Sequence, residues 1–379
     1  MSGLYLHIPF CKQACSYCDF YFVTRQHQQQ DFVHALVQEI RSKRDTKFTQ
    51  DKIRTIYFGG GTPSLLSTDQ LEQIIAAIDD TFSLEVEECT MELNPDDVSQ
   101  NYLAAIHSMG ITRASMGVQS FDEDLLRFMH RAHSREEALR CLELLAKTGF
   151  ESFTVDLIYG NPNQSIEMLS KDIETLLEFN PPHISAYSLT IEENTRLGKQ
   201  VSLGRLQAPE DDLTAQHFEI VHQKLSEKGI HQYEVSNFAK PGFEAKHNSA
   251  YWSHKNYLGL GPSAHSFWWN DDRQSAERWN NKKDINAYLK SDWEEKSDLE
   301  ILELHQLAEE RLMLGLRTKK GVNPADLTQR YNFNLSERQK AYLQAKERAG
   351  MVEFNPDRIA LTSTGLVIAD LIILDLITA

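Results

Sequence analysis

Residues 3–18 read GLYLHIPFCKQACSYC, a short apolar run followed by three cysteines within eight residues. The apolar run is typical of a β-strand, and similar runs recur along the first half of the chain. They begin near Thr55, Glu88, Arg113, Ser152 and His183. We expect amphipathic helices between them. The repeated alternation predicts an α/β fold with a parallel sheet and helices outside it, either doubly wound or curled into a partial barrel.

The expected helices carry their own start and stop signals. One has its apolar face over residues 71–78 and follows the capping box Ser67-x-x-Gln70. A second follows Ser134-x-x-Glu137 and stops at Gly149, and a third has its apolar face over residues 166–176. Right-handed crossovers then place every strand-end loop on one rim, where ligands of such folds bind.

The alternation of expected strands and helices ends at about residue 235. We expect three parts: residues 1–235 as the strand–helix core, residues 236–300 as an aromatic-rich segment, and residues 301–379 as a C-terminal domain. The last part opens on a helical segment from about residue 301. A second helix, a hairpin over residues 351–362 and a final amphipathic helix follow it. This order resembles a winged-helix module, and we expect a packing or partner domain because it lacks a basic face.

Composition excludes several classes of protein. The 379 residues include 39 Lys and Arg against 55 Asp and Glu, a formal charge of −16, which argues against a partner bound through its phosphates, so no nucleic acid is expected. The chain has no apolar run long enough to span a bilayer and no secretory signal, so we expect a cytoplasmic protein. Five cysteines exclude a disulfide scaffold. Cys89 and Cys141 are expected as small buried hydrophobes, and Glu85–Glu88 as a solvated acidic face.

The cysteine triplet has the spacing C-x3-C-x2-C, with Cys11, Cys15 and Cys18 in one loop after the first strand. One interpretation is a zinc site, which would need a fourth ligand such as His7 or His27. The other is a [4Fe–4S] cluster held by three thiolates, with one iron open to an exogenous ligand. The spacing favours the cluster.

This triplet, with Tyr17 just before its last cysteine, resembles the motif of the radical SAM superfamily. The resemblance implies a partial (β/α)6 barrel, followed here by the mainly helical, winged-helix-like domain. It also implies S-adenosylmethionine (SAM) chelated by the open iron, and an electron donor for the cluster. In that family an injected electron cleaves SAM to a 5′-deoxyadenosyl radical, while the protein positions the cofactor and excludes water.

The resemblance also implies a set of SAM-binding residues at successive strand ends. Glu92 and Asp156 would face the ribose hydroxyls, and Arg131 would pair with the carboxylate of SAM. Gln119 would supply an amide nearby. The remaining SAM contacts are expected from the glycine motif after the second strand and from two tyrosines: Gly60, Gly61, Thr62, Tyr5 and Tyr17.

The amino-acid sequence around these motifs is similar to that of the oxygen-independent coproporphyrinogen III dehydrogenase branch of the superfamily. The similarity extends over nearly the whole chain. This sequence differs from the dehydrogenases at two places near the cysteine loop. Phe20 stands where they carry a fourth cysteine, and only ten residues precede Cys11, where they have a longer porphyrinogen-binding segment. These departures favour the haem chaperones of the HemW type. The alternative is the dehydrogenase itself, which converts coproporphyrinogen III to protoporphyrinogen IX.

Residues 247–252 read HNSAYW and fit the HNxxYW pattern of the chaperone type. His247 is therefore the candidate haem contact, with Asn248, Tyr251 and Trp252 beside it, because imidazole ligates haem iron and aromatic rings offer flat faces to a porphyrin. Gly261 and His265, in a later family-like stretch, are expected near the cofactor. The resemblance implies haem and a haem-requiring recipient protein as partners. Peripheral contact with a membrane-bound recipient would need a specific patch, because the net charge repels anionic membranes.

Overall fold

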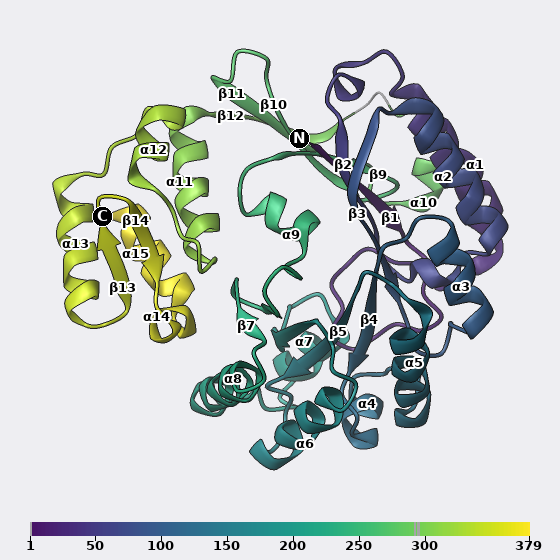
Figure 1. Ribbon diagram of the computed structural model, residues 1–379, viewed down its shortest axis with the longest axis horizontal. Coiled ribbons are helices and arrows are strands. Elements are labelled where there is room, and N and C mark those ends of the chain that lie inside the picture. The colour runs from purple at the N-terminus through teal and green to yellow at the C-terminus, as the bar shows by residue number, and fades with distance from the viewer. Residues whose placement is uncertain (1, 292, 294–295) are drawn as a thin grey trace.

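Six parallel strands, β1 to β6, lie side by side in the order of the sequence and form the centre of the fold (Figure 1). The structure is a computed structural model that describes residues 2–291, 293 and 296–379. Consecutive order excludes the doubly wound alternative and confirms the predicted partial barrel. The six strands are β1 Ser2–Ile8, β2 Ile53–Gly60, β3 Leu84–Leu93, β4 Arg113–Gln119, β5 Ser152–Tyr159 and β6 His183–Ser188.

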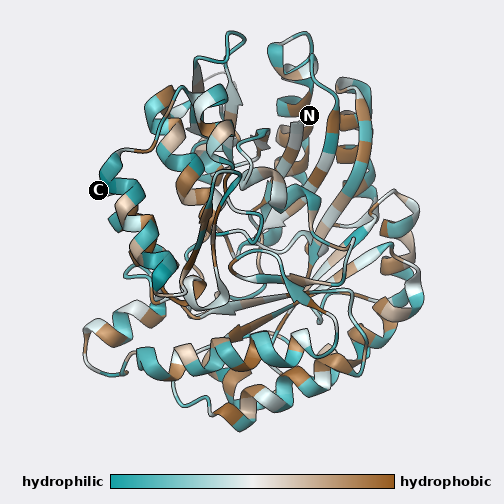
Figure 2. Cartoon of the chain, turned by 60° about the vertical axis from the view of Figure 1, so that its left-hand side comes forward, coloured by the Kyte–Doolittle hydropathy of each residue, from teal (hydrophilic) through white to brown (hydrophobic). Residues whose placement is uncertain are grey.

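Helices cover the outer face of the curved sheet, and Figure 2 shows them with apolar and polar residues on different sides. The strands alternate in the same sense. In β1 the side chains of Leu4, Leu6 and Ile8 are fully buried in the apolar core, while Tyr5 and His7 face the barrel interior. The helices of this part are α1 Gln29–Ser42, α2 Thr68–Thr81, α3 Gln100–Ser108, α4 Glu123–Phe128, α5 Arg135–Thr148, α6 Ile166–Leu177, α7 Arg196–Ser202 and α8 Asp211–Ser226.

The predicted helix signals are confirmed at the level of hydrogen bonds. Ser67 and Ser134 each accept a bond from the backbone N–H three residues later, and Gln70 and Glu137 reach back to the cap. Gly149 ends α5 in the left-handed conformation, which glycine adopts without steric cost. Together these signals fix where each helix begins relative to the rim loop before it.

The aromatic-rich segment extends the same sheet on both sides. The strand β9 (Asn256–Leu260) pairs in parallel with β1, and the antiparallel strands β10 (His265–Trp269), β11 (Ser275–Asn280) and β12 (Ser297–Glu303) continue from it. At the other edge, β8 (Asn237–Ala239) of this segment pairs with β6, and β7 (His231–Gln232), from the end of the strand–helix core, pairs with β8. Two short helices, α9 (Lys246–Tyr251) and α10 (Ile285–Tyr288), also belong to this segment.

The C-terminal part is a helical unit beside the β10–β12 extension (Figure 1). The helix expected from about residue 301 begins later than predicted. Residues 301–303 remain in β12, because Leu302 pairs with Ala276 of β11, and α11 begins only at Leu304. The predicted hairpin is confirmed, and the final helix is divided in two at Ile368. The elements are α11 Leu304–Leu316, α12 Pro324–Tyr331, α13 Glu337–Arg348, β13 Val352–Asn355, β14 Arg358–Leu361, α14 Ser363–Val367 and α15 Ala369–Thr378.

No helix in the described part of the chain combines the length and the apolar character that a membrane span requires.

The cap of α5 closes the rim loop that carries Arg131. We expect Ser134→Ala to destabilise the first turn of α5 by about 1 kcal/mol, because it removes the cap to the Glu137 N–H. Hydrogen exchange of the backbone amides in that turn measures the effect. Ser134→Thr retains a capping hydroxyl and is the matched control. Equal exchange in the alanine variant and the wild type would contradict the expectation.

Candidate cofactor site

The cysteine loop leaves the carboxyl end of β1 and is fixed by backbone hydrogen bonds. The Cys11 N–H donates to the Val23 carbonyl (3.0 Å) and the Val23 N–H to the Pro9 carbonyl (2.7 Å). All three loop cysteines are half-buried. Burial raises the pKa of Cys11 to about 12 and that of Cys18 to about 11. These thiols therefore lose their protons readily only when a metal centre accepts them as thiolates.

A zinc site would need a fourth ligand such as His7, whose ring is held by other groups. Among the residues that the structure describes, no three His, Cys, Asp or Glu side chains are grouped so that they could hold one metal ion. His7, one of the fourth ligands considered for zinc, has both ring nitrogens in hydrogen bonds, with the Tyr5 hydroxyl (3.2 Å) and the Tyr21 carbonyl (2.8 Å). A zinc ion that used His7 would therefore first have to break one of these hydrogen bonds, whereas a cluster needs only the three cysteines.

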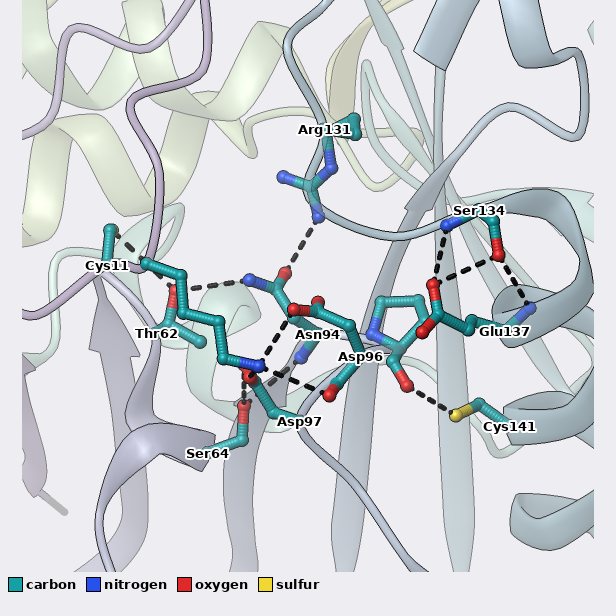
Figure 3. Close-up of polar contacts among 12 residues, drawn as sticks. Cys11, Thr62, Ser64, Asn94, Asp96, Asp97, Arg131, Ser134, Glu137 and Cys141 are labelled. Atoms are coloured by element: carbon teal, nitrogen blue, oxygen red, sulfur yellow. Dashed lines mark hydrogen bonds and ion pairs between the residues drawn. The ribbon is translucent and has the colours of Figure 1, made fainter. Parts of the chain in front are cut away.

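A chain of hydrogen bonds connects the cysteine loop to the neighbouring strand ends (Figure 3). Thr62 Oγ1 donates to Cys11 Sγ (3.6 Å), and Asn94 Nδ2 donates to Thr62 Oγ1 (3.2 Å). Arg131 donates to Asn94 Oδ1 (2.7 Å), and its Nη1 also lies 3.4 Å from Cys15 Sγ. The Tyr17 hydroxyl lies 3.4 Å from Arg131 Nη1. Besides the cysteines, three of the predicted site residues are thus brought together: Tyr17, Thr62 and Arg131.

Unpaired polar atoms lie beside this network. Within the described residues, Gln119 Oε1 and Arg131 Nε are buried and have no hydrogen-bond partner. Both side chains meet at Gly117, where an added Cβ would lie 3.2 Å from Gln119 Nε2 and 3.3 Å from Arg131 Nη2. Gln119 also has a φ of 69°, which is rare for a residue with a side chain. Buried polar atoms without partners are costly, and these two are available to a polar ligand.

Glu92 and Asp156 face the same interior from β3 and β5. Glu92 accepts hydrogen bonds from the Tyr57 hydroxyl (2.8 Å) and the Gly60 N–H (3.1 Å). Burial, opposed by those bonds and assisted by the Asp156 charge, raises the pKa of Glu92 to about 7. Burial also raises the pKa of Asp156 to about 6, although Ser185 and Ser115 donate to it. A pair of buried carboxyls is suited to receive hydroxyl groups of a ligand.

The glycine motif keeps β2 close to β1. An added Cβ at Gly61 would lie 2.7 Å from the Phe10 carbonyl and 2.8 Å from the Ile8 carbonyl, so only glycine allows this approach. Tyr5 is paired with Tyr57 in the β1–β2 register, and their rings lie 6.0 Å apart.

The first five HNxxYW residues lie in α9, which packs against β2 and β3, and Trp252 follows the helix. His247 is 1% exposed and stacks on Tyr57 with ring centroids 5.1 Å apart. Its Nδ1 lies 2.8 Å from Thr55 Oγ1, and its Nε2 lies 2.7 Å from the Tyr251 hydroxyl. Glu88 accepts from the backbone N–H of His247 (2.9 Å). The expectation that Glu88 is solvated is therefore wrong, because it faces inward and caps α9, whereas Glu85 and Glu87 do form surface ion pairs.

A cavity of about 500 Å³ opens between α9, β1 and the cysteine loop, a size typical of sites for small molecules and cofactors. Of the expected SAM residues Tyr5 and Glu92 line it, so part of the SAM set shares one space with His247, Asn248 and Tyr251 of the haem set. Trp252 is not among its lining residues, and its carbonyl accepts a hydrogen bond from Arg311 of α11 (3.1 Å). The lining residues are Tyr5, His7, Asp19, Phe20, Tyr21, Tyr57, Glu92, His247, Asn248, Tyr251, Tyr257, Ser263, His265 and Lys283.

Several contact residues were not predicted from the sequence. Asn94 connects Thr62 to Arg131, and its position just after the strand of Glu92 is the signal that could have indicated it. Tyr57 supports both Glu92 and His247. Thr55 is the partner of the His247 ring and is paired with Glu88 in the β2–β3 register, which no local pattern indicates.

Comparison with known proteins agrees with this geometry. The radical SAM superfamily model matches residues 5–176, and the HemN C-terminal domain model matches residues 302–368. The heme chaperone HemW of Lactococcus lactis is 40% identical over 324 residues, 85% of this chain and 83% of the relative. That of Bacillus subtilis is 34% identical over 374 residues, 96% of each chain.

Among solved structures, the coproporphyrinogen III oxidase HemN from Escherichia coli has a TM-score of 0.82 at 21% identity. The match covers 100% of this chain and 90% of that one, and it shows that the two share a fold. A [4Fe–4S] cluster and SAM are the cofactors of the superfamily. The chain belongs to the radical SAM superfamily and, within it, to the family of HemW-type heme chaperones.

Proposed function

We propose that this protein binds haem beside a SAM-liganded [4Fe–4S] cluster and transfers the haem to a recipient protein. The observation that carries the proposal is the shared cavity, in which Glu92 and His247 line one space next to the cysteine loop. The relatives named as heme chaperones support it. The bound cluster would supply SAM with an electron that it receives from an electron donor. We place this activity in the cytoplasm.

On this proposal Cys11, Cys15 and Cys18 hold the cluster. Thr62 and Arg131 donate hydrogen bonds to two of the three sulfurs, which favours their thiolate form once the cluster is bound. The Arg131 guanidinium also fits the carboxylate of SAM, and its unpaired Nε is available for such a contact. The proposed SAM set is completed by Tyr5, Tyr17, Gly60, Gly61, Glu92, Gln119 and Asp156.

Haem is assigned to the wall formed by His247, Asn248 and Tyr251. Tyr57, Tyr251 and Tyr257 provide aromatic surface to the cavity, and Phe20 at its edge is 71% exposed. Exposed aromatic surface of this kind suits the flat faces of a porphyrin. Trp252 belongs to the same motif, but its part in haem binding remains a prediction.

The cluster assignment has a direct chemical test. We expect Cys15→Ala to lose the cluster after anaerobic reconstitution, because one of three thiolate ligands is removed. Iron and acid-labile sulfide analysis measures the loss. Cys141→Ala is the matched control, since that thiol is buried in α5 and donates to the Pro95 carbonyl (2.8 Å), away from the loop. A wild-type protein that binds only zinc would contradict the cluster and the haem proposal with it.

The two buried carboxyls make SAM binding dependent on pH. Their ionised forms accept ribose hydroxyls, and pKa values of about 7 and about 6 mean that Glu92 is half protonated near pH 7 and Asp156 near pH 6. We expect SAM affinity to fall as the pH decreases from 8 to 5.5, by about tenfold or more, because a hydrogen bond to a charged group contributes about 1.5–3 kcal/mol. Anaerobic calorimetry of the cluster-loaded protein measures it, with cluster absorbance recorded at each pH.

Glu92→Gln is the control for this pH dependence. It should weaken SAM binding at pH 8 and flatten the response near pH 7, because glutamine does not titrate, while cluster content stays unchanged. A wild-type SAM affinity that is constant over the range would count against the ribose assignment.

The function itself is tested by two assays on the same cluster-loaded preparation. We expect saturable haem binding and transfer of that haem to an apo haem protein. We expect no protoporphyrinogen from coproporphyrinogen III with SAM and reductant, since Phe20 stands in place of the dehydrogenases' fourth cysteine. His247→Ala should weaken haem uptake and leave cluster content intact. Protoporphyrinogen formation by the wild type would support the dehydrogenase instead.

A further inference from the structure

Three imidazoles line the shared cavity: His7, His247 and His265. The first two are committed to other groups. Both ring nitrogens of His7 have hydrogen-bond partners, and so do both ring nitrogens of His247. Each ring is also buried, at 4% and 1% exposed. An iron ligand needs a free nitrogen lone pair, so binding by either ring would first require the loss of a buried hydrogen bond.

His265 differs from both in exposure and in its partners. It is the first residue of β10, its side chain is exposed, and its ring makes no hydrogen bond with any residue in the described ranges. Burial of part of the ring, together with the charges of Arg278 and Lys283 and against that of Asp298, lowers its pKa, so the imidazole is neutral near pH 7. The neutral ring is the form that binds a metal.

The backbone under His265 is held closely. An added Cβ at Gly259 would lie 2.1 Å from the His265 carbonyl, and one at Gly261 would lie 2.5 Å from the His7 carbonyl. The turn from β9 to β10 is therefore packed against the end of β1, the strand that delivers the cysteine loop. A ligand side chain carried here therefore starts from a fixed backbone position.

The remaining cavity wall near His265 fits the other parts of a haem. Phe20 and Tyr257 offer aromatic surface, and Lys283 is an exposed cation suited to a propionate carboxylate. Asp19 also lines the cavity and partly offsets that charge.

Resting on the proposed haem binding, we propose that His265 is the axial ligand of the haem iron, and that His247, held by Thr55 and Tyr251, is a wall against which the porphyrin packs. The two histidines then have separable roles. Removing His265 affects binding through iron alone, whereas removing His247 affects any porphyrin.

The test titrates cluster-loaded protein anaerobically with haem and, separately, with iron-free protoporphyrin IX. We expect His265→Ala to weaken haem binding at least about tenfold, shift the Soret band and leave protoporphyrin binding unchanged. Free imidazole should restore the wild-type spectrum. His247→Ala should weaken both ligands alike. His305→Ala, an exposed histidine on α11, is the matched control, and His265→Gln is a second variant that keeps a polar side chain.

The outcomes separate the two proposals. Wild-type protein that binds neither porphyrin overturns the haem function and the ligand assignment together. Wild-type protein that binds both, with unchanged haem affinity and Soret band in His265→Ala and His265→Gln, overturns only the ligand assignment. A selective loss of haem but not protoporphyrin in His247→Ala would assign the iron to His247 instead and would also overturn it.

Discussion

The parallel pairing of β1 with both β2 and β9 is the constraint on which the candidate site depends. Parallel neighbours bring their carboxyl ends to one edge. The end of β1 carries the cysteine loop, the end of β2 carries the glycine motif, and the end of β9 leads to His265. Any ligand held by the cysteines is therefore bordered on one side by residues 60–62 and on the other by the turn at residues 261–264. The shared cavity follows from strand order.

Burying polar groups in the barrel interior costs folding free energy, and several of these groups belong to the candidate site. Glu92 and Asp156 are forced toward neutrality by burial, and atoms of Gln119 and Arg131 are left without partners. The apolar core on the other face of the strands, with Leu4, Leu6 and Ile8 fully buried, supplies the stability that permits this. A bound ligand is one way in which such unsatisfied polar groups are completed.

How much was predictable from the sequence depended on whether the signal was local. The strands β1–β6, both capping boxes and the hairpin at residues 351–362 follow from short-range patterns, and they were predicted correctly. The joining of β9–β12 to the sheet depends on the pairing of β9 with β1, two segments 254 residues apart, which composition does not encode. Glu88 shows the same limit on a small scale. Only its register opposite Thr55 distinguishes it from the exposed acids beside it.

The geometry of the histidines bears on transfer rather than catalysis. Radical chemistry needs a closed site that excludes water, whereas a carrier must release its cargo. On the proposal made here, haem is held by one imidazole at the exposed start of a strand, with Phe20 and Lys283 at the open side of the cavity. A single accessible ligand can be exchanged for a ligand of the recipient without opening the core. His247, with both nitrogens occupied, can shape the cavity throughout that exchange without competing for the iron.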